Sequence, residues 1–249
     1  MSDLHGYLPN PKEIDYLMGG VDVICITGDI VPLAYQDDTL ESIAWLYTKF
    51  FPWVESLPCQ HVVFCWGNHD FVGEFLRVDK NGNHRKAKRV AKKMMFPSKL
   101  HLVEDSEFIY KGYKFYGSSW CPDLQWWAFY RNSEDLTKAF KKIPDDVDVL
   151  LTHCPPRVEM YGTVNAFNFN LGPDFGCVEL AEAVNEKKPR LHIFGHVHTG
   201  SHRLKQIGDT SFCNVSLLDE EYQLVYPPAI FSLDDEKVED VTIPQTPET

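Results

Sequence analysis

No C-x-x-C pair occurs in this sequence, although seven cysteines are scattered over its 249 residues. An odd, dispersed set of cysteines does not suit a disulfide framework, so we expect reduced thiols in a reducing compartment. No apolar run approaches the roughly 18 residues that a membrane-spanning helix needs, and the N-terminal residues show no signal-peptide pattern. We therefore expect a soluble, cytoplasmic protein with no membrane partner.

Positive charge is also scarce, because the formal net charge is -12 at pH 7. Nucleic-acid backbones favour clustered Lys and Arg, so this balance argues against an extended nucleic acid as the partner. One basic stretch, Arg85–Lys93, departs from the acidic average. It is typical of a solvated helical face, and the alternative is a patch that steers phosphate toward a nearby site.

Internal repeats and low-complexity linkers are absent as well, so no feature marks a domain boundary before Ser232. A hydrophobic content of 44% is enough for one sizeable core, and α/β enzymes of this length commonly form one domain. After Ser232 the sequence becomes acidic and then rich in Pro and Thr. We predict one domain over residues 1–232 and an acidic tail over residues 233–249.

Short apolar runs and helical stretches alternate along the chain. Asp38 with Glu41 forms a capping-box start for a helix that runs toward Phe51. A second helix is predicted from Val178 to Lys187. Four runs are short and apolar, as buried strands should be: residues 21–26, 61–66, 147–152 and 191–194.

Asp, Asn or His follows each of these four predicted strands. Ligands gather at the carboxyl ends of strands in layered α/β folds, where loops are supported by a rigid scaffold. The four strand ends therefore predict one site. The blocks that follow the strands are Gly28-Asp29, Gly67-Asn68-His69-Asp70, His153 and Gly195-His196-Val197-His198, and Asp3-Leu4-His5 lies at the N-terminus.

The polar side chains of these blocks have the chemistry of a metal site. Imidazole, carboxylate and amide donors without thiolate suit Mn²⁺ above all, with Fe²⁺, Zn²⁺ or Ni²⁺ as alternatives. The donors are too many for one ion but enough for two if one carboxylate bridges. Two ions about 3.5–4 Å apart polarise phosphoryl oxygens and generate a hydroxide that attacks the phosphate. The candidate ligands are Asp3, His5, Asp29, Asn68, His153, His196 and His198.

The charge of such a centre favours an anionic substrate. Two divalent ions, offset by Asp3, Asp29 and one hydroxide, leave a net charge of about +1 when the histidines are neutral. The site can therefore be positive although the protein as a whole is acidic. A small phosphate ester is the expected partner.

The five blocks, in this order, resemble the motifs of the calcineurin-like metallophosphoesterases. One stretch is similar to the branch related to class III cyclic-nucleotide phosphodiesterases and the metallophosphoesterase-domain brain proteins. It runs from His153-Cys154-Pro155-Pro156-Arg157 through Gly176-Cys177 to Gly195-His196-Val197-His198. One block alone arises easily by chance, but five in family order over residues 3–232 do not. The resemblance implies an α/β fold in which two mixed β-sheets, flanked by helices, form a four-layer sandwich.

The resemblance also implies a role for each candidate ligand. It places Asp3, His5 and His198 on one ion and Asn68, His153 and His196 on the other, with Asp29 bridging both. His69 is then a histidine that binds no metal, faces the substrate, and protonates the leaving oxygen or stabilises its charge. We group Asn68 with His69 as catalytic.

The sequence departs from the family pattern in two places. The family's Asp-x-His follows an apolar strand, but only Met1 and Ser2 precede Asp3. The first strand is therefore missing, and we interpret this as a truncation or a wrongly chosen start codon. If the chain starts here, we expect Asp3 and His5 to lie on a frayed end, with a less occupied metal site. Cys154 stands where relatives often carry Gly; it is interpreted as a small filler, and a redox-sensitive thiol is the alternative.

Three further interpretations concern residues around the blocks. Asp70 is expected to cap the segment that follows it. The aromatic stretch from Trp120 to Tyr130 suits a core or a subunit contact, and the alternative is a wall on which a nucleobase stacks. The polar and aromatic residues from Tyr161 to Phe169 are candidates for lining the pocket.

Four functions compete on this pattern. A phosphodiesterase acting on a small nucleotide-like ester is the leading hypothesis. A phosphomonoesterase of the protein phosphatase type is disfavoured, because Gly28-Asp29 continues into Ile30-Val31-Pro32-Leu33 without that group's arginine. The acidic charge disfavours a nuclease, and the retention of every ligand position disfavours a scaffold that has lost its metals. The physiological substrate and the oligomeric state stay open.

Overall fold

Strands and helices alternate through most of the computed structural model, which describes residues 1–18, 20–77, 93–157, 176–199, 202–234 and 236–242. The basic stretch, apart from Lys93, and the aromatic residues 161–169 lie outside these ranges. The helices are α1 (Pro11–Met18), η1 (Leu33–Tyr35), α2 (Thr39–Trp45), η2 (Leu46–Phe50), α3 (Phe51–Ser56), α4 (Phe71–Leu76), α6 (Ser133–Phe140) and α7 (Val178–Lys187). The strands are β1 (Val23–Thr27), β2 (His61–Cys65), β3 (Leu100–Leu102), β4 (Ser106–Tyr110), β5 (Tyr113–Ser118), β6 (Val149–Thr152), β7 (Leu191–Phe194), β8 (Lys205–Ile207), β9 (Thr210–Asn214), β10 (Phe231–Leu233) and β11 (Val238–Asp240).

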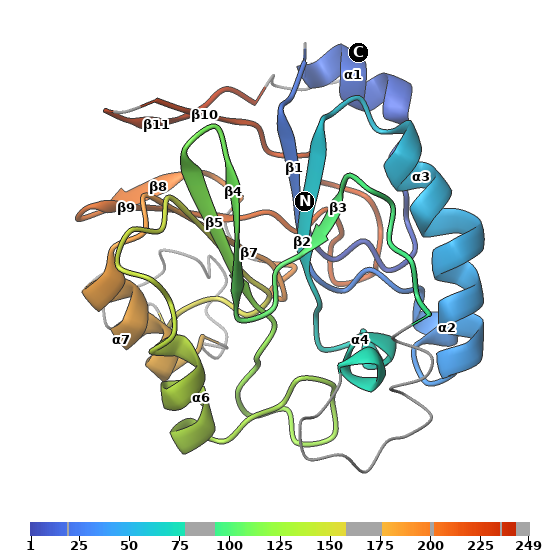
Figure 1. Cartoon of the computed structure of the whole chain (residues 1–249), viewed down its shortest axis with the longest axis horizontal. Coiled ribbons are helices and arrows are strands. Elements are labelled where there is room, and N and C mark those ends of the chain that lie inside the picture. Colours follow the sequence, from blue (N-terminus) through green and yellow to red (C-terminus); the bar gives the residue numbers. More distant parts are fainter. Residues whose placement is uncertain (19, 78–92, 158–175, 200–201, 235, 243–249) are drawn as a thin grey trace.

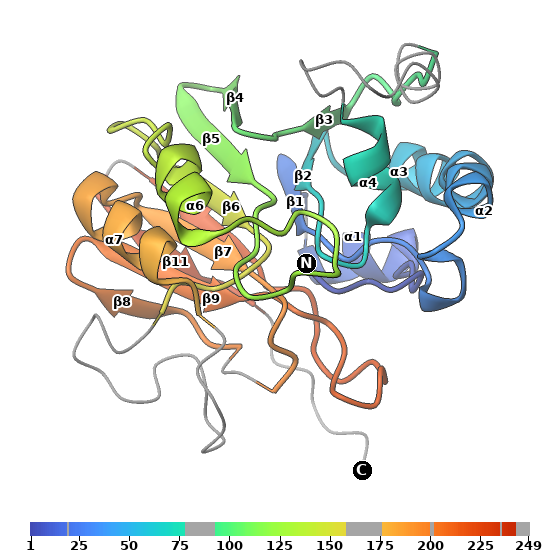
Figure 2. The same cartoon turned by 90° about the horizontal axis from the view of Figure 1, so that it is seen from below.

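Two β-sheets pack face to face at the centre of the molecule. The smaller has the order β1-β2-β3 and is parallel. The larger has the order β4-β5-β6-β7-β9-β8, with a parallel centre and antiparallel edges. Helices α1 to α4 cover the outer face of the smaller sheet, and α6 and α7 cover that of the larger one (Figures 1 and 2). This arrangement confirms the predicted four-layer sandwich.

The four apolar runs form the central strands, as predicted. They are β1, β2, β6 and β7, and each begins within two residues of its predicted start. Alternate side chains enter two different cores: Phe64 packs toward the helices, whereas Val63 and Leu151 pack between the sheets. Because both faces of these strands are largely buried, their sequences are mostly apolar and do not alternate regularly with polar residues.

The two predicted helices are present. Asp38 caps α2, because its side chain accepts hydrogen bonds from the backbone N–H groups of Leu40 (2.9 Å) and Glu41 (3.1 Å). This helix continues through η2 and α3 and ends at Ser56, beyond Phe51. Helix α7 has the predicted bounds.

The N-terminal residues are buried, so the expected frayed end is wrong. The Met1 ammonium group donates to the carbonyl of Cys25 (2.9 Å), and Thr27 N–H donates to the Met1 carbonyl (3.0 Å). On its other side, Ser2 pairs in parallel with Ser216. Asp3 is fully buried. The segment before the first metal block is therefore held between β1 and the residues that follow β9.

The predicted boundary between residues 232 and 233 needs correction, because it cuts through β10. Strands β10 and β11 pair as an antiparallel hairpin. Phe231, Leu233 and Val238 of this hairpin pack against the core between the sheets. The folded part therefore continues at least to Thr242, whose hydroxyl accepts from Ile230 N–H.

Among the described helices, none has the length and hydrophobicity that crossing a membrane requires.

Candidate metal centre

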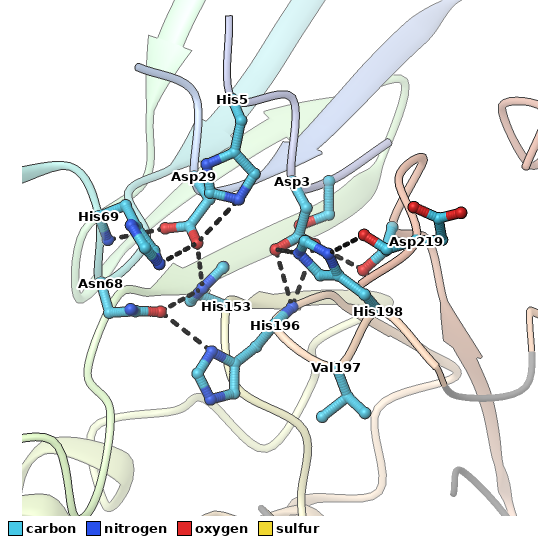
Figure 3. Close-up of polar contacts among 12 residues, drawn as sticks. Asp3, His5, Asp29, Asn68, His69, His153, His196, Val197, His198 and Asp219 are labelled. Atoms are coloured by element: carbon cyan, nitrogen blue, oxygen red, sulfur yellow. Dashed lines mark hydrogen bonds and ion pairs between the residues drawn. The ribbon is translucent and has the colours of Figure 1, made fainter. Parts of the chain in front are cut away.

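The predicted ligands converge at one edge of the sandwich (Figure 3). The loops after β1 and β2 leave the smaller sheet, and those after β6 and β7 leave the larger one, at carboxyl ends that meet because these strands run parallel. The N-terminal turn joins them through hydrogen bonds of Asp3 N–H to the Gly28 carbonyl (3.0 Å) and His5 N–H to the Asp29 carbonyl (2.8 Å). All seven candidate ligands lie in this cluster.

Asp3, His5 and His198 form the first group of donors. Each contributes one ligand atom, and these atoms lie within 4.8 Å of one another. His198 Nε2 is 3.3 Å from Asp3 Oδ1. This is the set that the family pattern places on one ion.

The second group is centred on Asn68. Its Oδ1 lies 2.8 Å from His153 Nε2 and 3.0 Å from His196 Nδ1. Asp29 lies between the two groups, because its Oδ2 is 3.3 Å from His153 Nε2 and 3.6 Å from His5 Nε2. A carboxylate that bridges two ions needs this position.

His69 lies beside the same carboxylate. Its Nε2 is 3.9 Å from Asp29 Oδ2, and with His5 and Asp29 it forms a further group of possible donors. Distance alone therefore allows His69 to bind a metal or to face the substrate. Its side chain keeps 15% of its surface exposed, whereas that of His153 keeps none.

Three histidines are held by hydrogen bonds at the ring nitrogen that points away from the centre. Nδ1 of His153 donates to the Thr27 carbonyl (2.8 Å), and Nδ1 of His198 donates to the Asp219 carbonyl (2.7 Å). His69 Nδ1 lies 2.6 Å from the side-chain oxygen of Gln36. Such bonds fix the tautomer and aim Nε2 inward. Sequence reasoning missed these partners because two of them are backbone carbonyls, which no residue type identifies.

Four candidate ligands adopt the left-handed backbone conformation that side chains disfavour. The φ angles are +53° at Asp3, +39° at His5, +51° at Asp29 and +70° at His196. Each such residue costs about 1–3 kcal/mol unless its surroundings enforce it, and such outliers cluster at functional sites. At Asp3 and His5, the hydrogen bonds of their backbone N–H groups to the loop after β1 hold the backbone in this conformation.

Asp70 ties two metal loops together and does not cap the next helix, which corrects the sequence interpretation. Although it precedes α4, its side chain makes no capping bond. Its Oδ1 accepts from Ile30 N–H and Val31 N–H, both at 2.9 Å, and its Oδ2 accepts from Gly67 N–H at 2.9 Å. One carboxyl group therefore holds the loop of Asp29 against the loop of Asn68.

Two glycines are required by close packing at the ligands. A Cβ atom at Gly67 would collide with the Asp29 carboxylate, and one at Gly195 would collide with Asp3 and Ser2. The structure thus explains why glycine occurs in both blocks: the backbone passes directly against the carboxylates.

The two buried carboxylates of the site, Asp29 and Asp3, each interact electrostatically with one imidazole. Burial opposes a charge on His153, but the neighbouring Asp29 outweighs it and raises the His153 pKa to about 9. Burial likewise opposes a charge on His198, yet the bond to Asp3 raises the His198 pKa to about 9. Burial lowers the pKa of His5 to about 4. Both imidazoles therefore favour the protonated state beside these carboxylates, and binding of a metal ion requires that their protons leave.

The donors fit two divalent cations. Both ring nitrogens of His5 are buried, and neither has a hydrogen-bond partner among the described residues. A buried imidazole without a partner is costly, and a bound metal ion removes that cost. The nitrogen and oxygen donors on either side of Asp29 match borderline or hard cations.

The predicted aromatic stretch divides between core and site. Trp120 and Phe129 are buried, and Trp120 lies between the guanidinium groups of Arg77 (4.2 Å) and Arg131 (4.0 Å). Trp127 packs on His69, with ring centroids 4.3 Å apart. Trp126 is 88% exposed. Only the middle of the stretch therefore reaches the metal centre.

Tyr222 forms a second aromatic contact with the centre, which sequence reasoning missed. Its ring centroid is 5.0 Å from that of His5 and 5.4 Å from that of His198. It is 42% exposed and has a φ of +57°. Two aromatic side chains therefore border the site, the half-buried Trp127 on His69 and the exposed Tyr222 on His5 and His198.

Cys154 is a buried thiol in contact with two others. Its Sγ donates to the Trp120 carbonyl, and hydrogen bonding to Cys121 raises the Cys154 pKa well above its usual value. The neighbouring Cys177 is buried as well. A thiol this reluctant to ionise suits the interpretation as a small filler, because oxidation needs exposure and thiolate character.

Comparisons with known proteins agree with this geometry. A family model described as calcineurin-like phosphoesterase matches residues 1–200. Human metallophosphoesterase domain-containing protein 1 is 28% identical over 245 residues, covering 94% of this chain and 69% of that protein. A UPF0046 protein of Caenorhabditis elegans is 30% identical over 243 residues, covering 94% and 79%. A phosphopantetheinyl hydrolase of Mycobacterium tuberculosis shares the fold, with a TM-score of 0.50 at 14% identity over 89% of each chain.

Proposed function

Because the chain belongs to the calcineurin-like phosphoesterase family, we propose that it hydrolyses a small, nucleotide-like phosphodiester. Members of this family are metal-dependent hydrolases of phosphoric esters that use a dinuclear divalent metal centre. One observation carries the proposal. Donors from four strand ends and the N-terminal turn converge on both sides of the Asp29 carboxylate, whose Oδ2 lies within 3.6 Å of His5 and His153.

Each candidate residue has a distinct task in this proposal. Asp3, His5 and His198 would hold one cation, Asn68, His153 and His196 would hold the other, and Asp29 would be shared by both. Two bound cations supply the Lewis acidity that polarises the phosphoryl oxygens and activates the attacking water. His69 donates a proton to the leaving oxygen, and Asn68 orients the phosphoryl group beside it. We propose Mn²⁺ as the native metal, with Fe²⁺, Zn²⁺ or Ni²⁺ as alternatives.

Charge and shape favour a small diester over a monoester. The loop after Asp29 brings no cation toward a doubly charged monoester, because Ile30 and Val31 are fully buried apolar residues. A centre with a net charge of about +1 matches the single negative charge of a diester. The half-buried Trp127 and the exposed Tyr222 beside the histidines suit a planar base on the ester.

The compartment follows from the thiols. All seven cysteines are free, and Cys121, Cys154 and Cys177 remain unbonded although they are neighbours. Such an arrangement favours a reducing environment. We propose the cytoplasm as the site of action.

A metal-by-substrate screen tests the function. The metal-stripped chain is reloaded with Mn²⁺, Zn²⁺, Mg²⁺ or Ni²⁺ and offered bis-p-nitrophenyl phosphate, p-nitrophenyl phosphate, cyclic nucleotides and single-stranded DNA. We expect Mn²⁺-dependent turnover of the diesters, with the monoester and DNA slower. An Asp29→Asn variant loaded identically is the control for contaminating hydrolases. Preference for the monoester, or for DNA with a steep salt dependence, would replace this proposal by a phosphomonoesterase or a nuclease.

A further inference from the structure

The His69 ring is held on two sides, by Gln36 and by Trp127. Its Nδ1 lies 2.6 Å from the Gln36 side-chain oxygen, the shorter of its two polar ring contacts. Its face packs on Trp127, with ring centroids 4.3 Å apart and planes 53° apart. The remaining ring nitrogen, Nε2, is directed at the metal centre, 3.9 Å from Asp29 Oδ2.

Gln36 lies on a turn that several hydrogen bonds hold in place. It ends the short helix η1, where its N–H donates to the Leu33 carbonyl (3.4 Å). The adjoining Tyr35 carbonyl accepts from Asp38 N–H (2.9 Å) and from the Ser42 hydroxyl (2.7 Å). Because Asp38 also caps α2, the loop that begins at Asp29 returns to the site with its backbone anchored.

The bond between Gln36 and His69 sets the state of the imidazole. An amide oxygen only accepts hydrogen bonds, so Nδ1 of His69 must be the nitrogen that carries the hydrogen. In a neutral ring, Nε2 is then the nitrogen that takes up a proton from solvent, and the resulting imidazolium donates that proton from Nε2 toward the ester. A neutral partner also avoids adding another carboxylate beside the buried Asp3, Asp29 and Asp70.

We propose that Gln36 is a positioning residue that fixes the tautomer and the orientation of His69 toward the leaving oxygen of the substrate. The inference rests on the role given to His69 in the proposed function. Gln36 acts through His69 and touches no reacting atom. Its loss should therefore lower kcat while leaving KM and metal content near their wild-type values.

A double-mutant cycle tests this dependence. Gln36→Met keeps the volume but removes the acceptor, and it should lower kcat about 10–100-fold, the usual cost of losing a partner that orients a functional histidine. Gln36→Glu restores an acceptor and should recover most of the activity. In the His69→Ala background, Gln36→Met should not lower kcat any further. The matched control is Gln206→Met at an exposed position of β8, which should match wild type.

Three results would overturn the proposal. Independent, multiplying losses in the double variant would show that Gln36 does not act through His69. A Gln36→Met variant with wild-type kcat would show that the bond is dispensable. An equal loss in Gln206→Met would show that the effect is not specific to the site.

A spectroscopic measurement separates this proposal from the proposed function. Long-range ¹H–¹⁵N spectra of the Zn²⁺-loaded full chain report which imidazole nitrogen carries hydrogen, and His69→Ala identifies the signals of His69. We expect hydrogen on Nδ1 in the wild type and in Gln36→Glu, with a mixture of tautomers in Gln36→Met. Hydrogen on Nε2 in the wild type would refute the positioning role. The expected spectra in a chain that cleaves no ester would instead refute the proposed function.

Discussion

Replacing Asp70 by Asn should weaken both the fold and the metal centre. The buried Asp70 carboxyl accepts from three backbone N–H groups, those of Ile30, Val31 and Gly67, each at 2.9 Å. An Asn side chain can keep its oxygen toward Ile30 and Val31. Its amide group then faces Gly67 N–H, so two donors oppose each other and one buried N–H loses its acceptor.

The magnitude follows from the bonds that are lost. A hydrogen bond to a charged group contributes about 1.5–3 kcal/mol, and leaving a buried donor unsatisfied costs about 1–3 kcal/mol. These two contributions overlap, and Asn also removes a charge whose burial beside Asp29 is unfavourable, so we expect a net loss of about 1–2 kcal/mol in the free energy of unfolding. The loop of Asn68 is no longer held against that of Asp29, so metal affinity should fall about 10–100-fold.

Urea denaturation of the metal-free chain and calorimetric titration with Mn²⁺ measure the two effects. Measurement at pH 8 keeps the carboxyl ionised, because burial and the nearby Asp29 raise the Asp70 pKa to about 7. Asp105→Asn is the matched control, since Asp105 accepts from Ser118, Trp120 and Lys142. It should lose stability but keep its metal affinity. Wild-type metal binding by Asp70→Asn, or equal weakening in both variants, would refute the reasoning.

Three further predictions concern the centre and the core. Elemental analysis of the Mn²⁺-reconstituted chain should find two ions with similar occupancy, because the Asp3 side is as buried as the other; no metal would end the dinuclear interpretation. Asp29→Asn should lower kcat/KM more than Asp3→Asn, since only Asp29 lies between both donor groups, and wild-type activity would show that the bridge is misplaced. Burial lowers the His192 pKa to about 3. Between this value and the ordinary pKa of about 6.5, only the unfolded chain takes up the proton. The free energy of unfolding therefore falls by about 1.4 kcal/mol for each unit by which the pH drops below 6.5. Denaturation of His192→Leu at pH 6.5 and pH 5 should show a drop about 2 kcal/mol smaller than in the wild type, and equal drops would contradict this.

Local patterns were sufficient where one short segment carries the whole signal. The short apolar runs predicted β1, β2, β6 and β7, because strands buried on both faces need mostly apolar residues. Asp38 with Glu41 predicted the start of α2, because a capping bond spans only three residues. The predicted boundary at Ser232 was wrong because it was read from a local pattern. The acidic sequence there concealed a hairpin whose Phe231 and Val238 pack against the core.

The sequence by itself determined which chemistry is available, since Asp, Asn and His at successive strand ends can only gather where parallel strands end together. Only the tertiary structure decided how those groups are held. Asp70 reaches the Asp29 loop across 40 residues, and Gln36 reaches His69 across 33. Asp3 is supported by Ser216, 213 residues away, whose hydroxyl donates to its carboxylate. Such bonds depend on distances between folded segments, and no spacing along the chain encodes them.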